Sequence, residues 1–197
     1  MTYEHAAYAD GYTSVCGVDE AGVGPLAGDV FAAAVILPQH CVIEGLNDSK
    51  KLTHKKRVLL REEIMRTAVA WHVSTATTAE IDRINIRQAT RLAMTRAIEG
   101  LLPDNANIFA LIDGNYNFDM PISCRFIVGG DGLSLSIAAA SVLAKVARDE
   151  YCQELHRQFP QYGFDKHKGY PTAAHYQVLR EHGASAVHRQ SFRLYKD

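Results

Sequence analysis

The stretch VCGVDEAGVGPLAG, residues 15–28, decides the fold that we predict for this chain. Residues 14–18 have the composition of a buried strand, and the chain then runs into two adjacent acids, Asp19 and Glu20. A loop with three glycines follows and leads into a second apolar stretch, residues 28–37. We therefore predict a β-hairpin in which two carboxylates lie at the end of a buried strand, beside a backbone that glycine keeps bare.

The composition is that of a single globular domain. The chain has 197 residues, of which 47% are hydrophobic and 22% are charged, and its 21 basic and 22 acidic residues nearly cancel. This balance argues against a protein that grips nucleic acid by net charge alone. The longest apolar run, residues 30–37, is too short to cross a bilayer, and no secretory pattern precedes it. We expect a cytoplasmic protein, and its four scattered cysteines predict neither a zinc site nor disulfides.

Hydrophobic periodicity predicts that strands and helices alternate along the rest of the chain. Thr53 and Thr77 have the character of helix N-caps, and Glu80 completes a capping box with Thr77. This order predicts an α/β fold, a mixed sheet flanked by helices, in which residues 1–158 form the core and 159–197 a small C-terminal helical segment of the same domain. The predicted strands are 14–18, 28–37, 71–75, 107–112 and 123–128, and the predicted helices are 54–69, 85–99, 134–156 and 172–182.

Three predicted strands end in an acid: Asp19, Asp113 and, after two glycines, Asp131. Ligands of open α/β sheets bind at the carboxyl ends of the strands, so these acids and Glu20 are expected to converge. A single acid in such a place more often forms a turn or caps a helix, but three in register favour a shared site. Four carboxylates repel one another unless cations neutralise them, and hard oxygen ligands suit Mg²⁺ or Mn²⁺.

Two divalent ions held about 3.5–4 Å apart by carboxylates serve in-line attack on phosphodiesters, so the acids predict a phosphodiesterase without a covalent nucleophile. Another interpretation makes GVGPLAG, residues 22–28, a dinucleotide-binding loop. It is disfavoured because Pro25 lies inside the loop and a strand follows it, so no helix start is available to hold a pyrophosphate.

Five segments together resemble bacterial ribonuclease HII, a type 2 ribonuclease H: GVDEAGVGPLAG, LNDSKKL, LIDGN, GGDGLSLSIAAASVLAKVARD and FPQYGFDKHKGYPTAAH. The resemblance implies a ribonuclease H-like fold, two Mg²⁺ or Mn²⁺ ions, and cleavage of the RNA strand of RNA/DNA hybrids. It also implies a monomer that incises duplex DNA 5′ to a single ribonucleotide and leaves a 3′-hydroxyl and a 5′-phosphate. The four acids of the family match Asp19, Glu20, Asp113 and Asp131, and Asp19 would bridge both ions.

The resemblance also implies a substrate surface, with the C-terminal segment beside the cleft. Gly22, Val23 and Gly24 would bring bare peptide groups against the sugar–phosphate backbone. Tyr170 matches a residue that packs on the deoxyribose after the ribonucleotide, where the absence of a 2′-hydroxyl is sensed. Lys145 and Arg148 share a helix face and are candidates for contact with substrate phosphates, but they could equally face solvent or pair with Asp149 and Glu150. The remaining candidates for contact with the nucleic-acid backbone are Asn47, Ser49, Lys50, His167 and Lys168.

Three positions depart from the family pattern. Val23 stands where an arginine is usual, Gly129 where a lysine is usual, and Tyr116 where a basic residue is common. Losing cations beside acids is expected to weaken the binding of substrate phosphates. Two hypotheses follow: an active metal-dependent endonuclease with reduced affinity, or a hybrid-binding protein of the same fold that has lost turnover.

Overall fold

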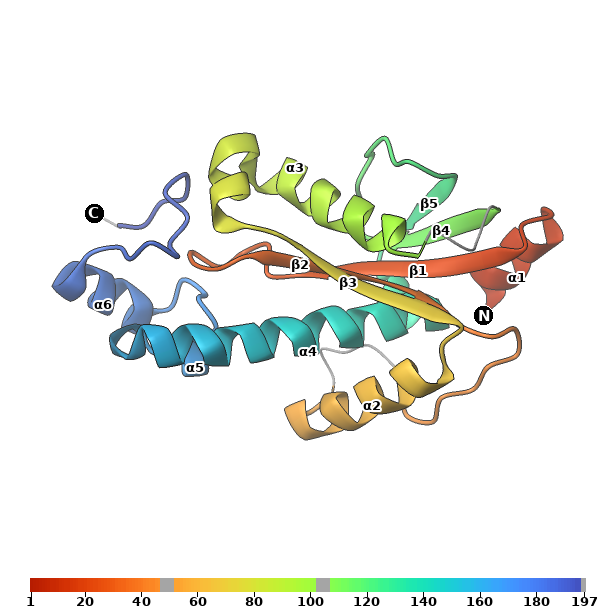
Figure 1. Cartoon of the computed structure of the whole chain (residues 1–197), viewed down its shortest axis with the longest axis horizontal. Coiled ribbons are helices and arrows are strands. Elements are labelled where there is room, and N and C mark those ends of the chain that lie inside the picture. Colours follow the sequence, from red (N-terminus) through yellow and green to blue (C-terminus); the bar gives the residue numbers. More distant parts are fainter. Residues whose placement is uncertain (47–51, 102–106, 196–197) are drawn as a thin grey trace.

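The structure is a computed structural model, and it describes residues 1–46, 52–101 and 107–195. Its centre is one five-stranded mixed sheet with the strand order β3-β2-β1-β4-β5 (Figure 1). The three strands β1, β2 and β3 are antiparallel neighbours, whereas β1, β4 and β5 are parallel neighbours. The predicted mixed α/β sheet is therefore confirmed. The strands are β1 (Ser14–Ala21), β2 (Val30–Ile36), β3 (Ala70–Ala76), β4 (Ile108–Asp113) and β5 (Cys124–Ile127).

Helices cover both faces of the sheet. The helix α3 (Thr78–Glu99) packs on one face, and α4 (Leu135–Gln158) and α2 (His54–Thr67) pack on the other (Figure 1). The helix α1 (Thr2–Ala9) lies near the start of β1, and α5 (Phe164–His167) and α6 (Ala173–His182) follow α4 in the C-terminal segment. The short 3₁₀ turns η3 (Gly130–Gly132) and η4 (Pro160–Tyr162) precede and follow α4. No helix in the described ranges is both long and apolar enough to cross a lipid bilayer.

The strand β1 alternates between the two layers, as the two-residue period of a strand requires. Cys16 and Val18 are fully buried in the apolar cluster on the α3 side. Gly17 faces α4, where a Cβ would lie 2.0 Å from the backbone carbon of Ser136. Only glycine therefore allows α4 to approach the sheet so closely. Small α4 residues such as Ala139, Ala140 and Ala144 are fully buried in the cluster on that side.

The predicted elements are all present, but several bounds differ. The strand β1 runs on to Ala21, so Asp19 and Glu20 lie within the strand instead of in the loop after it. Thr77 caps α3 through the predicted capping box with Glu80, and α3 already begins at Thr78. Asn85 interrupts the helical backbone with φ 66°. The helix α1 is an addition, because the sequence patterns predicted no element there.

Candidate active site

Three of the four predicted acids line one pocket of about 250 Å³ at the carboxyl ends of β1 and β4. Asp19 and Glu20 enter from β1, and Asp113 is the last residue of β4. The loop after β1 forms one wall, and α4 and the C-terminal segment form the other. The remaining lining residues are Ala21, Gly22, Val23, Gly24, Ser141, Lys145, Arg148 and Tyr170.

Strand register brings Asp19 and Asp113 level with each other. The parallel pairing of β1 with β4 ends at Val18 and Ile112, and each acid is the next residue of its strand. Residues paired in register point to the same face of a sheet, so both carboxylates are directed to the α4 side. The fold thus brings together Asp19 and Asp113, as their positions at the ends of predicted strands led us to expect.

Asp19 lies in a strongly unfavourable electrostatic environment. Its side chain is only 5% exposed, and burial followed by the charge of Glu20 holds the pKa of Asp19 well above its ordinary value. Asp113 raises the pKa further, while hydrogen bonds from the Ser141 hydroxyl and the Glu20 amide lower it. The Glu20 amide lies 2.7 Å from Oδ1 of Asp19. A bound divalent cation would relieve this repulsion.

Glu20 is the next residue of the strand and points to the opposite, α3 side of the sheet. There the hydroxyl of Tyr116 donates a hydrogen bond of 2.9 Å to Oε1 of Glu20. Burial and the charge of Glu20 raise the pKa of Tyr116, so its hydroxyl remains protonated and can donate. Tyr116 was noted in the sequence only as a missing cation. It proves to contact one of the predicted acids directly.

Asp131 lies on the adjoining 3₁₀ turn η3 and is 6% exposed. It lines a neighbouring hollow together with Met1, Leu46 and Leu133, whereas Asp19, Glu20 and Asp113 line the pocket. The turn is nevertheless tied to the pocket, because the amide of Gly130 donates a hydrogen bond of 2.6 Å to Oδ1 of Asp113. The structure therefore brings Asp19, Glu20 and Asp113 together in one pocket, and Asp131 lies on the adjoining turn η3.

The donor set fits a hard divalent cation in its chemistry. The pocket acids offer carboxylate oxygens, and the charges of Glu20 and Asp113 both act unfavourably on Asp19. In the described ranges, no three histidine, cysteine, aspartate or glutamate side chains already stand in an arrangement that holds a metal ion. The acids are thus gathered in one place without forming a finished coordination shell.

The glycine loop is fixed by a buried arginine that the sequence patterns did not single out. Arg189 is fully buried, and its guanidinium donates to the carbonyls of Gly22 (2.6 Å), Val23 (2.8 Å) and Gly28 (2.8 Å). Gly22 has φ +97°, and a Cβ there would lie 2.0 Å from Nε of Arg148. Only glycine fits this position.

The two departures near the acids have different surroundings. Val23 packs its side chain against the apolar cluster on the α3 side. Positive φ among the described residues other than glycine occurs at His40, Asn85 and Lys168, so β-branching at Val23 causes no backbone strain. Gly129 has φ +65°, and a Cβ there would meet nothing within 4 Å.

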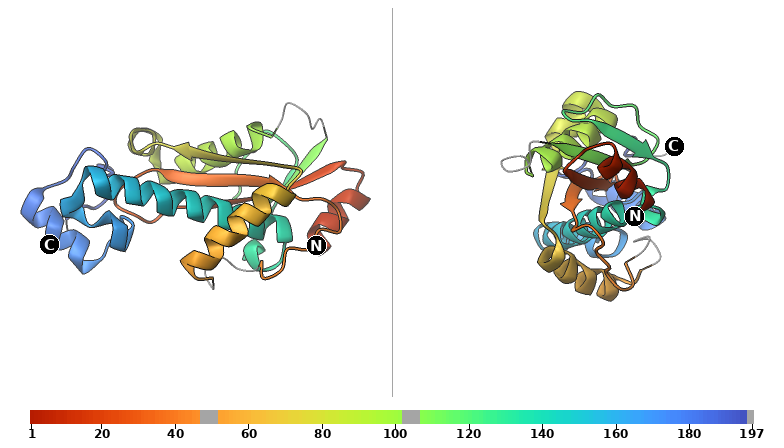
Figure 2. Two further views of the ribbon diagram at one scale, coloured as in Figure 1. Left: turned by 60° about the horizontal axis from the view of Figure 1, so that its bottom comes forward. Right: turned by 90° about the vertical axis from the view of Figure 1, so that its right-hand side faces the viewer.

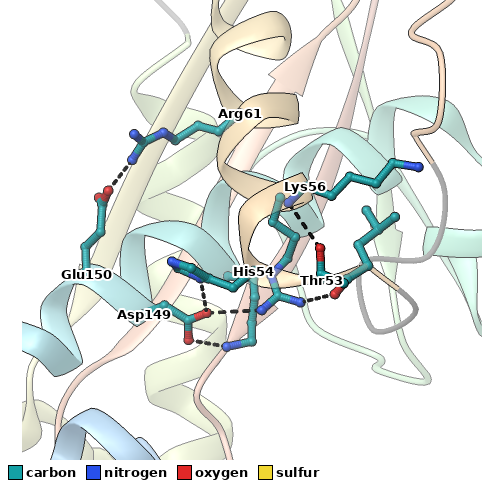
Figure 3. Close-up of polar contacts among 9 residues, drawn as sticks. Thr53, His54, Lys56, Arg61, Asp149 and Glu150 are labelled. Atoms are coloured by element: carbon teal, nitrogen blue, oxygen red, sulfur yellow. Dashed lines mark hydrogen bonds and ion pairs between the residues drawn. The ribbon is translucent and has the colours of Figure 1, made fainter.

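The predicted phosphate contacts on α4 are engaged within the protein. Lys145 lines the pocket and pairs with the buried Asp149, which also faces Arg57 and His54 of α2 at 3.4 and 3.6 Å. Glu150, the next residue, pairs with Arg61 at 2.5 Å (Figure 3). Arg148 is 1% exposed and donates to the carbonyl of Lys168 at 3.0 Å. The sequence had left pairing with Asp149 or Glu150 open for both Lys145 and Arg148; Lys145 forms such a pair, and Arg148 donates to a carbonyl.

The three C-terminal candidates have different surroundings. Tyr170 is 43% exposed, and its ring lies 3.6 Å from the position that a Cβ on Gly24 would occupy. His167 Nε2 donates to the carbonyl of Tyr162 at 2.6 Å, and its Nδ1 accepts from the Gly169 amide at 3.2 Å. Lys168 has a left-handed backbone that ends α5. Asn47, Ser49 and Lys50 lie outside the described residues.

A sequence model of the family described as Ribonuclease HII matches residues 16–195. The ribonuclease HII of Dechloromonas aromatica (strain RCB) is 58% identical over 178 residues, which cover 90% of this chain and 90% of that protein. The chain therefore belongs to the ribonuclease HII family and is a hydrolytic endoribonuclease, which confirms the resemblance found in the sequence.

Solved structures support the fold independently. The ribonuclease H2 of Pyrococcus horikoshii OT3 superposes with a TM-score of 0.76 at 21% identity, covering 92% of this chain and 95% of that one. Bst-RNase HIII in complex with Mn²⁺ superposes with a TM-score of 0.71 at 18% identity, covering 96% of this chain and 70% of that one. Both comparisons confirm the predicted ribonuclease H-like fold.

Proposed function

We propose that this protein hydrolyses the RNA strand of RNA/DNA hybrids and incises duplex DNA on the 5′ side of a single ribonucleotide. The products would be a 3′-hydroxyl and a 5′-phosphate. The observation that carries the proposal is the pocket in which Asp19, Glu20 and Asp113 face a bare glycine loop and the exposed Tyr170. Such a pocket offers carboxylates for cations and open backbone for a sugar–phosphate chain.

The proposed cofactor is a pair of Mg²⁺ or Mn²⁺ ions held by Asp19, Glu20 and Asp113, with Asp131 on the adjoining turn. When bound, such ions activate the attacking water and stabilise the departing oxygen. The chain's own part is to keep the carboxylates in place. Each of the three carboxylates accepts a hydrogen bond: Asp19 from the Ser141 hydroxyl, Glu20 from the Tyr116 hydroxyl, and Asp113 from the Gly130 amide.

Recognition of a lone ribonucleotide must rest on its 2′-hydroxyl, the group that distinguishes the two sugars. Arg189 holds the carbonyls of Gly22 and Val23, so the peptide groups of the loop keep a fixed orientation toward the pocket. The ring of Tyr170 stands beside Gly24, where it would pack on the following deoxyribose. Arg148 lies 5.7 Å beneath that ring and supports it.

The test is incision of a labelled duplex that carries one ribonucleotide, over a titration of Mg²⁺ and of Mn²⁺. We expect a single cut 5′ to the ribonucleotide, dependent on metal, and no cut in the all-DNA duplex. Binding without incision at high protein concentration would instead support the hybrid-binding alternative. That alternative is not favoured, because the four acids are all present in a chain of a hydrolytic family. The Val23 and Gly129 departures are expected to weaken substrate affinity and leave the chemistry intact.

A further inference from the structure

The feature that leads beyond the proposed function is the hydrogen bond between Tyr116 and Glu20. Tyr116 lies in the segment after β4, and its hydroxyl donates to Oε1 of Glu20 at 2.9 Å. The contact joins residues that are 96 positions apart in the sequence. Glu20 lines the pocket, whereas the Tyr116 ring packs into the apolar cluster on the α3 side. Tyr116 therefore reaches the pocket through Glu20.

The Tyr116 ring is held by its neighbours on several sides. It stacks on Phe118 with ring centres 4.5 Å apart and planes 16° apart, and Phe126 approaches edge-on at 6.4 Å. The guanidinium of Arg87 lies 5.4 Å from the centre of the Phe118 ring. A Cβ at Gly114, where φ is +106°, would come within 2.8 Å of Cε2 of Tyr116. A ring fixed in this way keeps its hydroxyl at one place.

A fixed hydroxyl restricts Glu20 in a way that a cation would not. The bond holds one carboxylate oxygen, so the group loses rotational freedom before any ligand arrives. A phenol adds no positive charge, whereas an arginine or lysine beside Glu20 would repel a divalent ion. Partners that orient metal-binding side chains typically change metal affinity or activity by 10-fold to 100-fold when they are removed.

We propose that Tyr116 is a positioning residue that orients the Glu20 carboxylate for divalent-cation binding. The proposal rests on the proposed function, because it takes Glu20 as a metal ligand. It assigns a role to a position that the sequence patterns treated only as a lost basic residue. The phenol compensates for that loss by ordering the carboxylate without competing with the cation.

The experiment measures Mn²⁺ binding to the full chain by isothermal titration calorimetry without substrate. We expect Tyr116→Phe to bind Mn²⁺ about 10-fold more weakly than wild type, and to melt at a similar temperature because both rings remain. Tyr12→Phe is the matched control, because Tyr12 packs on Phe109 before the start of β1 and should leave Mn²⁺ affinity unchanged. Wild type and Tyr116→Phe binding Mn²⁺ equally, or wild type binding none, would overturn the proposal.

A double-mutant cycle with Glu20→Gln identifies the route of the effect. If Tyr116 acts through Glu20, adding Tyr116→Phe to Glu20→Gln should weaken Mn²⁺ binding no further. Full additivity would contradict the proposal. In the incision assay we expect Tyr116→Phe to lower kcat and leave the KM for duplex unchanged. The two proposals can fail separately. If Tyr116→Phe binds Mn²⁺ more weakly than wild type but wild type does not incise the duplex, the positioning role is supported and the nuclease proposal is refuted.

Discussion

At the scale of single residues, the two adjacent acids of β1 have different surroundings because a strand alternates its faces. Asp19 turns toward Ser141 of α4, where it is deeply buried, and Glu20 turns toward Tyr116. Each acid is thus ordered by a neutral hydroxyl and neither is neutralised by it. The arrangement keeps negative charge available for cations at the cost of repulsion within the protein.

Asp19→Asn should abolish cleavage, with a loss of more than about 100-fold, because even an orienting partner of a metal ligand is worth 10-fold to 100-fold. The same variant should melt at a higher temperature than wild type without metal at neutral pH. The reason is that a carboxylate with a raised pKa destabilises the folded state once it ionises, so stability falls as pH rises above 3.8. The incision assay checks the loss of cleavage, and calorimetric melting with and without Mg²⁺ checks the change in stability, since Mg²⁺ should stabilise wild type more than the variant. Full activity of Asp19→Asn would contradict the assigned role.

That Asp19, Glu20 and Asp113 lie in one pocket could be predicted from the sequence, because Asp19 and Asp113 each follow an apolar run, Glu20 is next to Asp19, and neighbouring parallel strands share an edge. Tyr116 and Arg189 could not be predicted in their roles. Their partners lie 96 and up to 167 residues away along the chain, and no local pattern marks such contacts. The buried carbonyls of the glycine loop need a hydrogen-bond donor, and this need would point to a residue such as Arg189. It becomes visible only in the folded structure, because the sequence does not show that the loop is buried.

At the scale of elements, one buried and one exposed carboxylate of α4 form ion pairs with α2. Asp149 is 3% exposed and faces Lys145, Arg57 and His54, whereas Glu150 is largely exposed and pairs with Arg61 (Figure 3). The two neighbouring acids thus form a buried network and a surface pair on the same stretch of helix. Because Asp149 is buried and Glu150 is exposed, removing the charge of Asp149 should cost more stability than removing the charge of Glu150.

Asp149→Asn should lower the free energy of unfolding by about 3 kcal/mol, because it leaves cations near a buried site without their counter-charge. Glu150→Gln is the matched control and should lower it by less than about 1 kcal/mol. Urea denaturation at low ionic strength measures both. Equal losses for the two variants would show that burial does not distinguish these pairs.

Arg189→Lys should detach the glycine loop while keeping the charge. A lysine cannot reproduce the three guanidinium bonds to Gly22, Val23 and Gly28, so the KM for duplex should rise several-fold and the free energy of unfolding should fall by about 3 kcal/mol. The control is Arg180→Lys on the exposed side of α6, which should change stability by less than about 0.5 kcal/mol. Wild-type KM and stability in Arg189→Lys would remove the assigned role of Arg189.

The element bounds that sequence patterns missed have tertiary causes. The strand β1 continues to Ala21 because β2 keeps pairing with it as far as Phe31. The helix α1 is short, and its buried Glu4 accepts hydrogen bonds from Ser134 and Ser136 at the start of α4. Such contacts stabilise a segment that has no amphipathic pattern of its own.

At the scale of the whole molecule, α4 runs along the sheet (Figure 2). It begins at the end of the molecule where the N-terminus lies and ends at the C-terminal segment. That segment packs around Phe164 and Leu179 in an apolar cluster that also includes Leu26 and Ala27 of the glycine loop. The loop is therefore held between the sheet and the C-terminal segment. Its geometry depends on how well that segment stays folded.

Two buried histidines make this segment sensitive to acid. His188 Nδ1 accepts from the Ser185 amide at 2.9 Å, so its Nε2 carries the proton and donates to Nε2 of His175 at 3.0 Å. Nδ1 of His175 then donates to the carbonyl of Tyr170 at 3.0 Å. Both rings must be neutral in this chain of bonds, because a second proton on either would leave two N–H groups facing each other.

Lowering the pH should therefore loosen the C-terminal segment before the sheet. Burial, and then the neighbouring His175, lower the pKa of His188 from 6.5 to about 4. A base with a depressed pKa contributes stability that is complete above pH 6.5 and is lost as pH falls toward 4, by about 3 kcal/mol for this shift. Protonation of Asp19 in β1 stabilises the folded state over part of the same pH range, because its pKa is raised. The loss of stability should therefore be confined to the C-terminal segment. Hydrogen exchange as a function of pH should show protection falling in residues 172–189 while β1 and β4 stay protected, and uniform loss across the chain would contradict this assignment.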